Sequence, residues 1–288
     1  MKILLATAAT AASYLAWQNW ELTRFCVTEY QVASTKLEYP ANVAVISDLH
    51  GFTYGKGNRR LLRRVQGLKP HAIFIPGDMI VSKYSGTYQT ALKTLQRLVK
   101  IAPVYYSYGN HESRMRTPAK RDHPLFLRYM EDVRRAGVNV METESREISL
   151  NGNQVTLSAL ELELDYYEKG RIVPMGPGYL EQSLGVGDKE QLQILLAHNP
   201  AYAKEYAAWG ADVSFCGHNH GGLIRIPGVG SILSPQLTWF PKYDAGKFQI
   251  GGKTVIVSRG LGTHTFHIRV FNRAELVSVK FIPKGKIS

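Results

Sequence analysis

Residues 43–50 read VAVISDLH, a short apolar run that ends in the polar residues Asp48 and His50. An apolar run of about four to eight residues is typical of a buried strand. Four later stretches have the same form: AIFIPGD at 72–78, VYYSYGNHE at 104–112, LQILLAHNP at 192–200 and DVSFCGHNHGG at 212–222. The sequence therefore predicts five buried strands, each followed directly by a polar cluster.

Helical patterns lie between these strands. Residues 58–68 predict a helix that Asn58 caps, with an apolar face formed by Leu61, Leu62, Val65 and Leu68. We expect further helices at 87–101, 124–136 and 200–209, a hairpin around 151–153, closing strands at 254–258 and 275–282, and a loop at 165–187. The alternation predicts one α/β domain with helices on the faces of its sheets.

The composition excludes several classes of protein. Of the 288 residues, 44% are apolar and 20% are charged, which excludes a disordered chain. A mean hydropathy of −0.17, without several long apolar runs, excludes a polytopic membrane protein. Cys26 and Cys216 lie far apart, which excludes a disulfide scaffold and a Cys-rich zinc module.

The five polar clusters are expected to meet at one edge of the fold, because ligands bind beyond the carboxyl ends of strands in α/β sheets. The converging side chains are Asp48, His50, Asp78, Asn110, His111, His198, His218 and His220. Carboxylate, carboxamide and imidazole groups suit divalent metals such as Mn, Fe or Zn. Each residue alone also has a structural explanation, as a turn residue, a helix-entry residue or a surface histidine. Their recurrence after five strands favours a shared site for two ions, which can stabilise both oxygens in hydrolysis at phosphorus.

This ordered set of motifs resembles the calcineurin-like metallophosphoesterases over roughly residues 41–283. The resemblance rests on Asp48-x-His50, Gly77-Asp78, Gly109-Asn110-His111-Glu112, His198 and Gly217-His218-x-His220. It implies a sandwich of two mixed β-sheets flanked by helices. The stretches Phe240-Pro-Lys-Tyr-Asp, Ser258-Arg-Gly-Leu-Gly and Arg269-Val-Phe-Asn-Arg look like the membrane-anchored bacterial branch. That branch includes UDP-2,3-diacylglucosamine hydrolases, which cleave a pyrophosphate.

The resemblance also implies a role for each site residue. Asp48, His50 and His220 would hold one ion, and Asn110, His198 and His218 the other. Asp78 would bridge the two ions. His111 would not be a ligand but would donate a proton to the leaving oxygen or stabilise the charged transition state. Manganese is the expected metal, with iron and zinc as alternatives, and Glu112 either orients a neighbour or is exposed.

The resemblance implies a binuclear-metal phosphoesterase that hydrolyses a phosphodiester or pyrophosphate bond, of a lipid-linked or nucleotide-sugar substrate at a membrane. Two other functions compete: a nuclease of the same superfamily, and a catalytically silent metal-binding scaffold. No aromatic–basic stacking platform stands out, which argues against nucleic acid as a partner. Every ligand position and His111 are filled, which argues against a silent scaffold. Nothing in the sequence specifies an oligomeric state.

The N-terminus is expected to attach the chain to a membrane. Residues 3–20 are uncharged, and as a helix they span about 27 Å, close to the thickness of a bilayer core. We expect a single-pass anchor at 1–22, a linker at 23–40 and the phosphoesterase domain at 41–288. A cleaved signal peptide and a buried helix are the alternatives. The flanking charges favour a catalytic domain outside the cytoplasm.

The formal net charge of +12 is concentrated in patches. Six bases and no acid lie between Leu49 and Gly77, and the expected helix at 58–68 carries Arg59, Arg60, Arg63 and Arg64 opposite its apolar face. Such patches favour phosphate-bearing partners, here a phosphorylated substrate and an anionic membrane surface. A solvated basic face is the simpler alternative.

Overall fold

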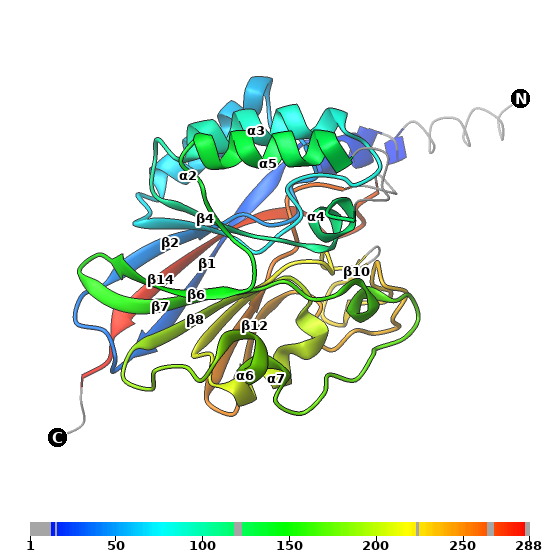
Figure 1. The fold of residues 1–288 in the computed structure, drawn as a ribbon. Coiled ribbons are helices and arrows are strands. Elements are labelled where there is room, and N and C mark those ends of the chain that lie inside the picture. Colours follow the sequence, from blue (N-terminus) through cyan, green and yellow to red (C-terminus); the bar gives the residue numbers. More distant parts are fainter. Residues whose placement is uncertain (1–12, 15, 118–122, 223–224, 264–267, 286–288) are drawn as a thin grey trace, which may run out of the picture.

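The computed structural model describes residues 13–14, 16–117, 123–222, 225–263 and 268–285, which form two six-stranded sheets packed face to face (Figure 1). In the first sheet, β2 to β5 are parallel, and β14 joins β2 in the antiparallel sense. The strand order is β1 (Phe25–Ser34), β14 (Ala274–Pro283), β2 (Ala41–Val45), β3 (Ala72–Ile75), β4 (Val104–Ser107) and β5 (Asn139–Met141).

The second sheet is also mixed. Its strand order is β12 (Gly246–Ile250), β13 (Lys253–Val257), β9 (Val213–Cys216), β8 (Leu192–Ala197), β7 (Asn153–Leu160) and β6 (Glu144–Leu150). The β6–β7 pair is the hairpin predicted around 151–153, and β7, β8, β9 and β13 are parallel. A small pair, β10 (Arg225–Ile226) and β11 (Gly230–Ser231), stands apart from both sheets.

Helices cover the outer face of each sheet (Figure 1). The first sheet carries α2 (Arg59–Gly67), α3 (Gly86–Leu98) and α5 (His123–Arg135), and the second carries α6 (Tyr179–Leu184) and α7 (Ala203–Trp209). Shorter turns of helix are α4 (Asn110–Met115), η1 (Lys56–Asn58), η2 (Leu164–Tyr167) and η3 (Pro200–Tyr202). The predicted fold class, two mixed sheets flanked by helices, is confirmed.

Three apolar layers hold the fold together. One lies between the first sheet and its helices, the second between the two sheets, and the third between the second sheet and α6 and α7. Phe74 and Phe215 meet across the middle layer with ring centroids 5.7 Å apart. Because strands such as β3 and β8 are buried on both faces, they are apolar at every position except Gln193, and this apolar character made them predictable from the sequence.

The predicted linker at 23–40 is wrong over most of its length. Residues Phe25–Ser34 form β1, which pairs with β14 in parallel over ten residues. This strand lies at the edge of the sheet, and most of its residues are only partly buried. It therefore lacks the continuous apolar run of the central strands. Its polar residues Glu29 and Gln31 led to the prediction of a linker. Residue 36 is also fixed, because the Lys36 ammonium pairs with Asp212 at 2.8 Å.

The predicted cap at Asn58 is also wrong. Asn58 adopts a left-handed conformation, with φ of 59°, and its side chain makes no cap hydrogen bond. Its carboxamide oxygen instead accepts from the main-chain N–H of Tyr54, and its NH₂ group donates to the Phe52 carbonyl and to Thr94. Asn58 therefore holds the turn before α2 against α3. The predicted loop at 165–187 likewise contains α6 and the end of η2.

The predicted anchor is described only in part, since residues 1–12 and 15 lie outside the described residues. Residues 16–22 are helical and pack against the domain. Gln18 exchanges two hydrogen bonds with the main chain of Arg269, and Glu21 pairs with Arg273 at 2.9 Å. Among the residues that the structure describes, no helix has the length and apolar character needed to cross a bilayer.

Candidate metal centre

The eight predicted site residues lie together where β2, β3, β4, β8 and β9 end. All eight are buried, and none has more than 8% of its surface exposed. The loops that carry them are joined by main-chain hydrogen bonds: Asp48 N–H donates to the Gly77 carbonyl and His50 N–H to the Asp78 carbonyl. Side chains join the two sheets, since the His218 N–H donates to Oδ1 of Asp48 at 3.0 Å. The structure therefore brings every predicted residue into one cluster.

The backbone of this cluster is unusual. Asp48, His50, Asp78, His218 and His220 all have φ between 50° and 65°, the left-handed region that side chains with a Cβ rarely adopt. Each such residue costs on the order of 1 kcal/mol or more, and such conformations concentrate at functional sites. Gly77 shows how tight the packing is, because a Cβ at this position would lie 2.6 Å from the Gly109 Cα and the His198 Nδ1. The surrounding packing thus holds the backbone of these polar residues in energetically costly conformations.

Within the described residues, three overlapping groups of side chains place their ligand atoms within 4.8 Å of one another. They are Asp48–His50–His220, Asp48–Asp78–His198 and His50–Asp78–His111. Asp78 belongs to the second and third groups, and its Oδ2 is 3.1 Å from Nε2 of His198 and 3.9 Å from Nε2 of His50. Asp48 is shared in the same way, with Oδ1 at 3.3 Å from His220 and 3.7 Å from His198.

Main-chain carbonyl groups fix the orientation of three imidazoles by contacting the ring nitrogen that faces away from the centre of the cluster. Nδ1 of His50, His198 and His220 lies 3.0, 2.8 and 3.2 Å from the carbonyl oxygens of Ile80, Pro76 and Gly262. A carbonyl oxygen can only accept, so Nδ1 carries the proton and, in the neutral ring, Nε2 presents a lone pair to the centre of the cluster. This arrangement is the usual one behind metal-bound histidines.

The ring of His111 has the opposite hydrogen-bonding pattern, because its Nδ1 accepts a hydrogen bond instead of donating one. The main-chain N–H of Ser82 donates to its Nδ1 at 2.9 Å, and the Ser82 hydroxyl is 3.0 Å away. A main-chain N–H can only donate, so Nδ1 accepts and Nε2 carries the proton in the neutral ring. His111 thus has a hydrogen to give in the cluster, although it also belongs to one of the three candidate groups of ligands.

The donor set fits two divalent cations. Nε2 of His50 and Nε2 of His220 face each other at 3.1 Å, and a cation between them removes the repulsion of two lone pairs. Nε2 of His198 and Nε2 of His218 are buried, and the former faces Oδ2 of Asp78 at 3.1 Å. A buried imidazole lone pair beside a carboxylate is costly unless a cation binds both. Asn110 Oδ1 lies 3.0 Å from Nδ1 of His218, beside the second group.

The pKa values reflect two carboxylates buried side by side. Burial and the charge of Asp78 raise the pKa of Asp48 to about 6. Burial also acts on Asp78, but the neighbouring His198 and His111 outweigh it and hold the pKa of Asp78 well below its usual value. The charges of Asp78 and Asp48 overcome burial and raise the pKa of His198 to about 9, whereas burial lowers the pKa of His218 to about 3. The raised pKa values of Asp48 and His198 both reflect neighbouring carboxylates, whose negative charge attracts cations.

A cleft of about 410 Å³ opens onto the cluster. Asp78, Asn110, His111, His218 and His220 lie at its base. The rest of its lining includes the cationic Lys83, Arg114, Lys169 and Arg269, the apolar Leu237 and Ile268, and neutral polar side chains such as Ser82 and Gln236. A substrate with a phosphate group next to an apolar group matches this lining.

The calcineurin-like phosphoesterase family profile matches residues 41–222, well over half of the chain. The chain belongs to this family. The phosphoesterase is accordingly a metal-dependent hydrolase of phosphoester bonds, and the family together with the residue clusters indicates a site for two metal ions.

Several known proteins are similar to this phosphoesterase. The Escherichia coli phosphodiesterase YaeI is 26% identical over 214 residues, covering 74% of this chain and 71% of YaeI. The Bacillus subtilis protein YpbG is 24% identical over 275 residues, covering 93% of this chain and 91% of YpbG. Among solved structures, a dimetal phosphatase from Danio rerio has a TM-score of 0.45 and 13% identity, covering 77% of this chain and 88% of its own.

Glu112 of the phosphoesterase is a positioning residue for which sequence reasoning gave no definite role. Its buried carboxylate accepts five hydrogen bonds, four from the main-chain N–H groups of Asp78, Met79, Ile80 and Gly109 and one from the Tyr106 hydroxyl. Burial raises the pKa of Glu112, while the four N–H groups, which can only donate, favour the ionised form. Glu112 thereby fixes the loop that carries Asp78. Its place directly after His111 was the signal available in the sequence.

Proposed function

We propose that the phosphoesterase hydrolyses a phosphodiester or pyrophosphate bond of a substrate that carries an apolar group, at a membrane surface. The observation that carries the reaction is the contrast among the imidazoles. In the neutral ring, His50, His198 and His220 present lone pairs to the centre of the cluster, whereas His111 presents a hydrogen. Candidate metal ligands and a candidate proton donor are therefore neighbours in the cluster.

The first ion matches the group Asp48–His50–His220 found in the structure, and the other ligand roles follow the family resemblance. We assign Asp48, His50 and His220 to one ion, His198, His218 and Asn110 to the other, and Asp78 to both. Two divalent ions, when bound, polarise the phosphoryl oxygens and supply a nucleophile at neutral pH. Manganese suits this mixture of carboxylate, carboxamide and imidazole donors, with iron and zinc as alternatives.

His111 acts on the leaving group in this proposal. The alkoxide that leaves a phosphodiester is a strong base, so a proton delivered as the P–O bond breaks lowers the barrier. Nε2–H of His111 is the proton source, and Ser82 holds the ring by its other nitrogen. The cationic Lys83, Arg114 and Lys169 in the cleft walls balance the charge of the phosphoryl group.

The apolar side chains of the cleft support a lipid-linked substrate, such as a nucleotide-linked acyl sugar. Leu237 and Ile268 line the cleft and are about half exposed, at 46% and 45%. Trp17, in the helical segment after the apolar N-terminal residues, contacts Phe271 with ring centroids 5.7 Å apart, and Phe271 adjoins the cleft residue Asn272. An N-terminal segment in a membrane would therefore keep the cleft beside the lipid. The flanking charges favour the extracytoplasmic side.

One assay series tests both parts of the proposal. The full-length enzyme is given bis(p-nitrophenyl) phosphate and p-nitrophenyl phosphate with Mn²⁺ or with a chelator, and then diesters that share a headgroup with and without an acyl chain. We expect hydrolysis with Mn²⁺ only, a higher kcat/KM for diesters than for monoesters, and a further rise with the acyl chain. No Mn²⁺-dependent hydrolysis would indicate a silent scaffold.

The apolar side chains have a matched control. Leu237→Gln together with Ile268→Gln should remove the preference for the acyl chain and leave bis(p-nitrophenyl) phosphate hydrolysis unchanged. Ile172→Gln changes an equally exposed residue outside the cleft and should alter neither. If the double variant keeps the acyl preference, the lipid-linked substrate is rejected while the phosphoesterase reaction stands.

A further inference from the structure

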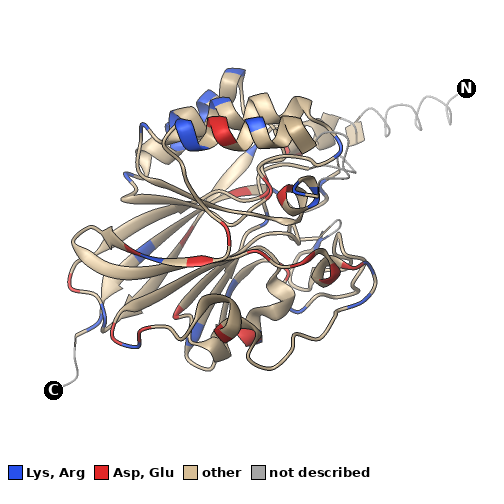
Figure 2. Ribbon diagram, viewed as in Figure 1, with Lys and Arg blue, Asp and Glu red and all other residues tan. Residues whose placement is uncertain are grey.

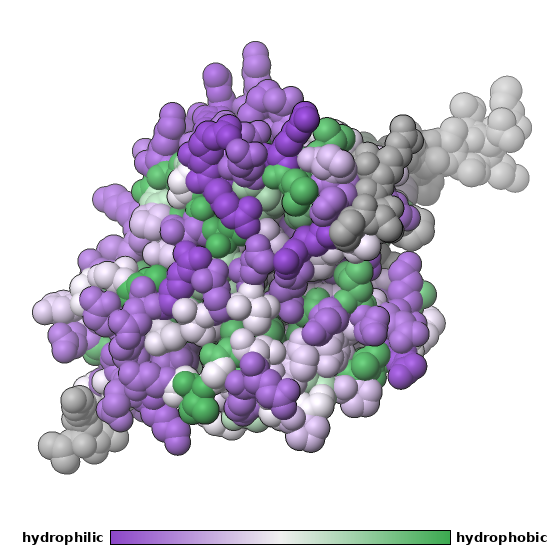
Figure 3. Space-filling model, in the orientation of Figure 1, coloured by the Kyte–Doolittle hydropathy of each residue, from purple (hydrophilic) through white to green (hydrophobic). Residues whose placement is uncertain are grey.

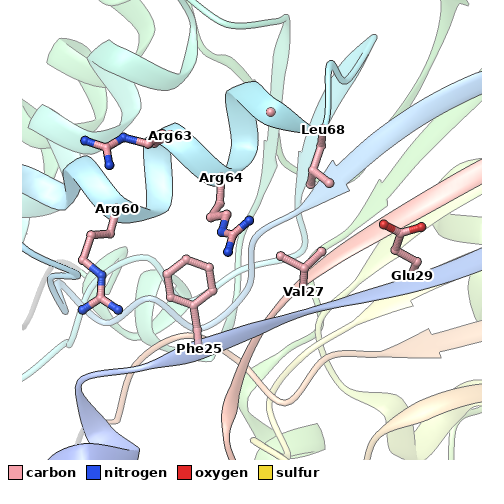
Figure 4. A pocket seen from close by; sticks show the side chains of 8 residues that line it. Phe25, Val27, Glu29, Arg60, Arg63, Arg64 and Leu68 are labelled. Atoms are coloured by element: carbon pink, nitrogen blue, oxygen red, sulfur yellow. The ribbon is translucent and has the colours of Figure 1, made fainter.

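A second concave site lies away from the metal centre, between helix α2 and the edge strand β1 (Figure 4). It has a volume of about 590 Å³ and is lined by Phe25, Val27, Glu29, Arg60, Arg63, Arg64, Gly67 and Leu68. We call these residues the arginine groove. The groove exists because the edge strand β1 is only partly covered: Phe25 and Val27 pack against the helical layer of the first sheet but stay half-buried. None of its residues belongs to the catalytic cleft.

The groove has a wall formed by the arginines of α2 and a floor formed mainly by β1, and these two sides differ in chemistry. Phe25 and Val27 of β1, with Leu68 at the end of α2, give a half-buried apolar floor. In Figure 4, Arg60 and Arg64 extend from α2 toward the strand on either side of the Phe25 ring, and Arg63 points away along the helix. Cationic side chains therefore lie directly beside a half-buried apolar surface.

The charge of the wall is not neutralised within the described part of the chain. No ion pair there involves Arg60, Arg63 or Arg64, and the side chain of Arg60 donates only to the Thr23 carbonyl, at 3.2 Å. Glu29, the one acid in the lining, pairs with Lys280 at 3.5 Å and stands at the far end of the groove. Figure 2 shows Lys and Arg over the helical layer that includes α2, and Figure 3 shows the same layer covered by hydrophilic side chains.

We propose that the arginine groove binds the headgroup of an anionic phospholipid, with the phosphate against Arg60 and Arg64 and the first carbons of the acyl chains against Phe25 and Val27. A free anion would use the arginines and leave the apolar floor in water. An anionic lipid uses both. The site is also close to the membrane segment, because residues 16–22 lead directly into Phe25 and Arg60 reaches back to Thr23. The inference rests on the membrane attachment proposed above, but not on the reaction.

The test uses the full chain, because β1 forms half of the groove and an N-terminal truncation into it would destroy the site. Protein in neutral detergent micelles is equilibrated with equal amounts of phosphatidylglycerol and phosphatidylcholine, and the lipids that remain bound after gel filtration are measured by mass spectrometry. We expect the wild-type protein to retain phosphatidylglycerol preferentially. Each basic residue near an anionic lipid is worth about fivefold in affinity.

The main variant is Arg60→Gln with Arg63→Gln and Arg64→Gln, which should lower the ratio of phosphatidylglycerol to phosphatidylcholine at least about tenfold. The matched control removes the same charge from exposed positions outside the groove, by Arg59→Gln, Lys93→Gln and Arg128→Gln, and should keep the ratio. Val27→Glu, which places a carboxylate on the apolar floor, should act like the main variant. Gln31→Glu, on the same strand outside the lining, should not.

Several outcomes would overturn the proposal. If the main variant and its control keep the same ratio, α2 is only a solvated basic face. If excess inorganic phosphate displaces all the phosphatidylglycerol, the groove is a free-anion site. If a poly-glutamate peptide displaces the lipid where phosphate does not, the groove binds an acidic protein segment.

The proposal can fail or hold independently of the catalytic function. The main variant should unfold at the wild-type temperature and hydrolyse bis(p-nitrophenyl) phosphate at the wild-type rate, which shows that the fold and the cleft are intact. Loss of soluble-ester hydrolysis at an unchanged unfolding temperature would place the arginines in the active site and overturn the assignment. If the wild-type protein hydrolyses nothing, the lipid ratios still decide this inference.

Discussion

The main-chain N–H of His111 donates to Oδ1 of Asp78 over 2.9 Å, while Oδ2 of the same carboxylate faces His198. One oxygen of Asp78 therefore holds the loop that carries the proton donor, and the other is turned toward the metal ligands. Ligand binding and proton donation share one carboxylate, so the two functions are positioned together.

Asp78→Asn should abolish hydrolysis and reduce bound metal from two ions toward one or none. The carboxamide keeps an oxygen for the His111 N–H, so the loop should stay in place, but it lacks the negative charge that serves both ions. Metal content is measured by mass spectrometry of the dialysed protein, with Asp132→Asn, a half-exposed carboxylate on α5, as the control. Retention of two ions at full occupancy would rule out Asp78 as the shared ligand.

His111→Ala should keep both metal ions and slow turnover by about 10²–10⁴, the usual contribution of a positioned proton donor. The loss should be smaller for p-nitrophenyl esters than for alkyl esters, because nitrophenolate leaves without help. Ser82→Ala keeps the main-chain N–H that binds Nδ1 and should have little effect. An equal loss for good and poor leaving groups would contradict proton donation and indicate charge stabilisation instead.

Glu112→Gln should destabilise the protein by about 2–5 kcal/mol, measured by urea unfolding. Both carboxylate oxygens accept main-chain N–H groups, so the NH₂ group of glutamine must face donors in either orientation. Glu131→Gln, on the exposed surface of α5, should change the free energy of unfolding by less than about 0.5 kcal/mol. Equal stability of the two variants would show that Glu112 is protonated in the folded protein.

Asp212→Asn should lower stability at neutral pH but not at low pH. Burial acts to raise the pKa of Asp212, but hydrogen bonds from the Gln193 N–H, Lys253 and Lys36 outweigh it and lower the pKa. A carboxyl with a lowered folded pKa contributes stability above its unfolded pKa of about 3.9, and this contribution is lost as the pH falls through the folded pKa. Because the group is partly exposed, we expect about 1 kcal/mol at pH 7.

The measurement is the difference in unfolding temperature between the wild-type protein and Asp212→Asn from pH 8 down to pH 3.5. It should be constant above about pH 5 and shrink below it. Asp132→Asn should show no such trend. A difference that grows on acidification would contradict the assigned direction of the pKa shift.

The parts of the fold that could be predicted from sequence are those whose residues are buried on both sides. β3 and β8 are apolar at nearly every position, so their limits were found within a residue or two. β1 could not be predicted, because an edge strand leaves much of its surface in water and its partner β14 lies at the other end of the sequence. The prediction of Asn58 as a helix cap was wrong because the Asn58 side chain binds Thr94, which lies on a helix distant in the sequence.

The candidate site was more predictable than the fold around it. Each of its eight residues lies in the short segment that follows a buried strand, so a strand prediction also places the side chain at the edge of the sheet. The role of Glu112 could not be derived in the same way, because its partners are mostly main-chain N–H groups. Almost every residue type has such a group, so the sequence does not show which ones bind Glu112. The tautomers of His50 and His111 likewise depend on main-chain atoms of neighbouring loops.

The parallel pairing of β1 with β14 bears on the order in which the protein can be completed during synthesis. Phe25 pairs with Ala274, so β1 leaves the ribosome long before the strand that holds it. At about 5–20 residues per second, the ribosome needs roughly 10–50 s to make the chain between them. Once β5 has been made, the first sheet can assemble from β2 to β5 alone, and the nascent chain still exposes Phe25 and Val27. The arginine groove is therefore among the last features of the molecule to form.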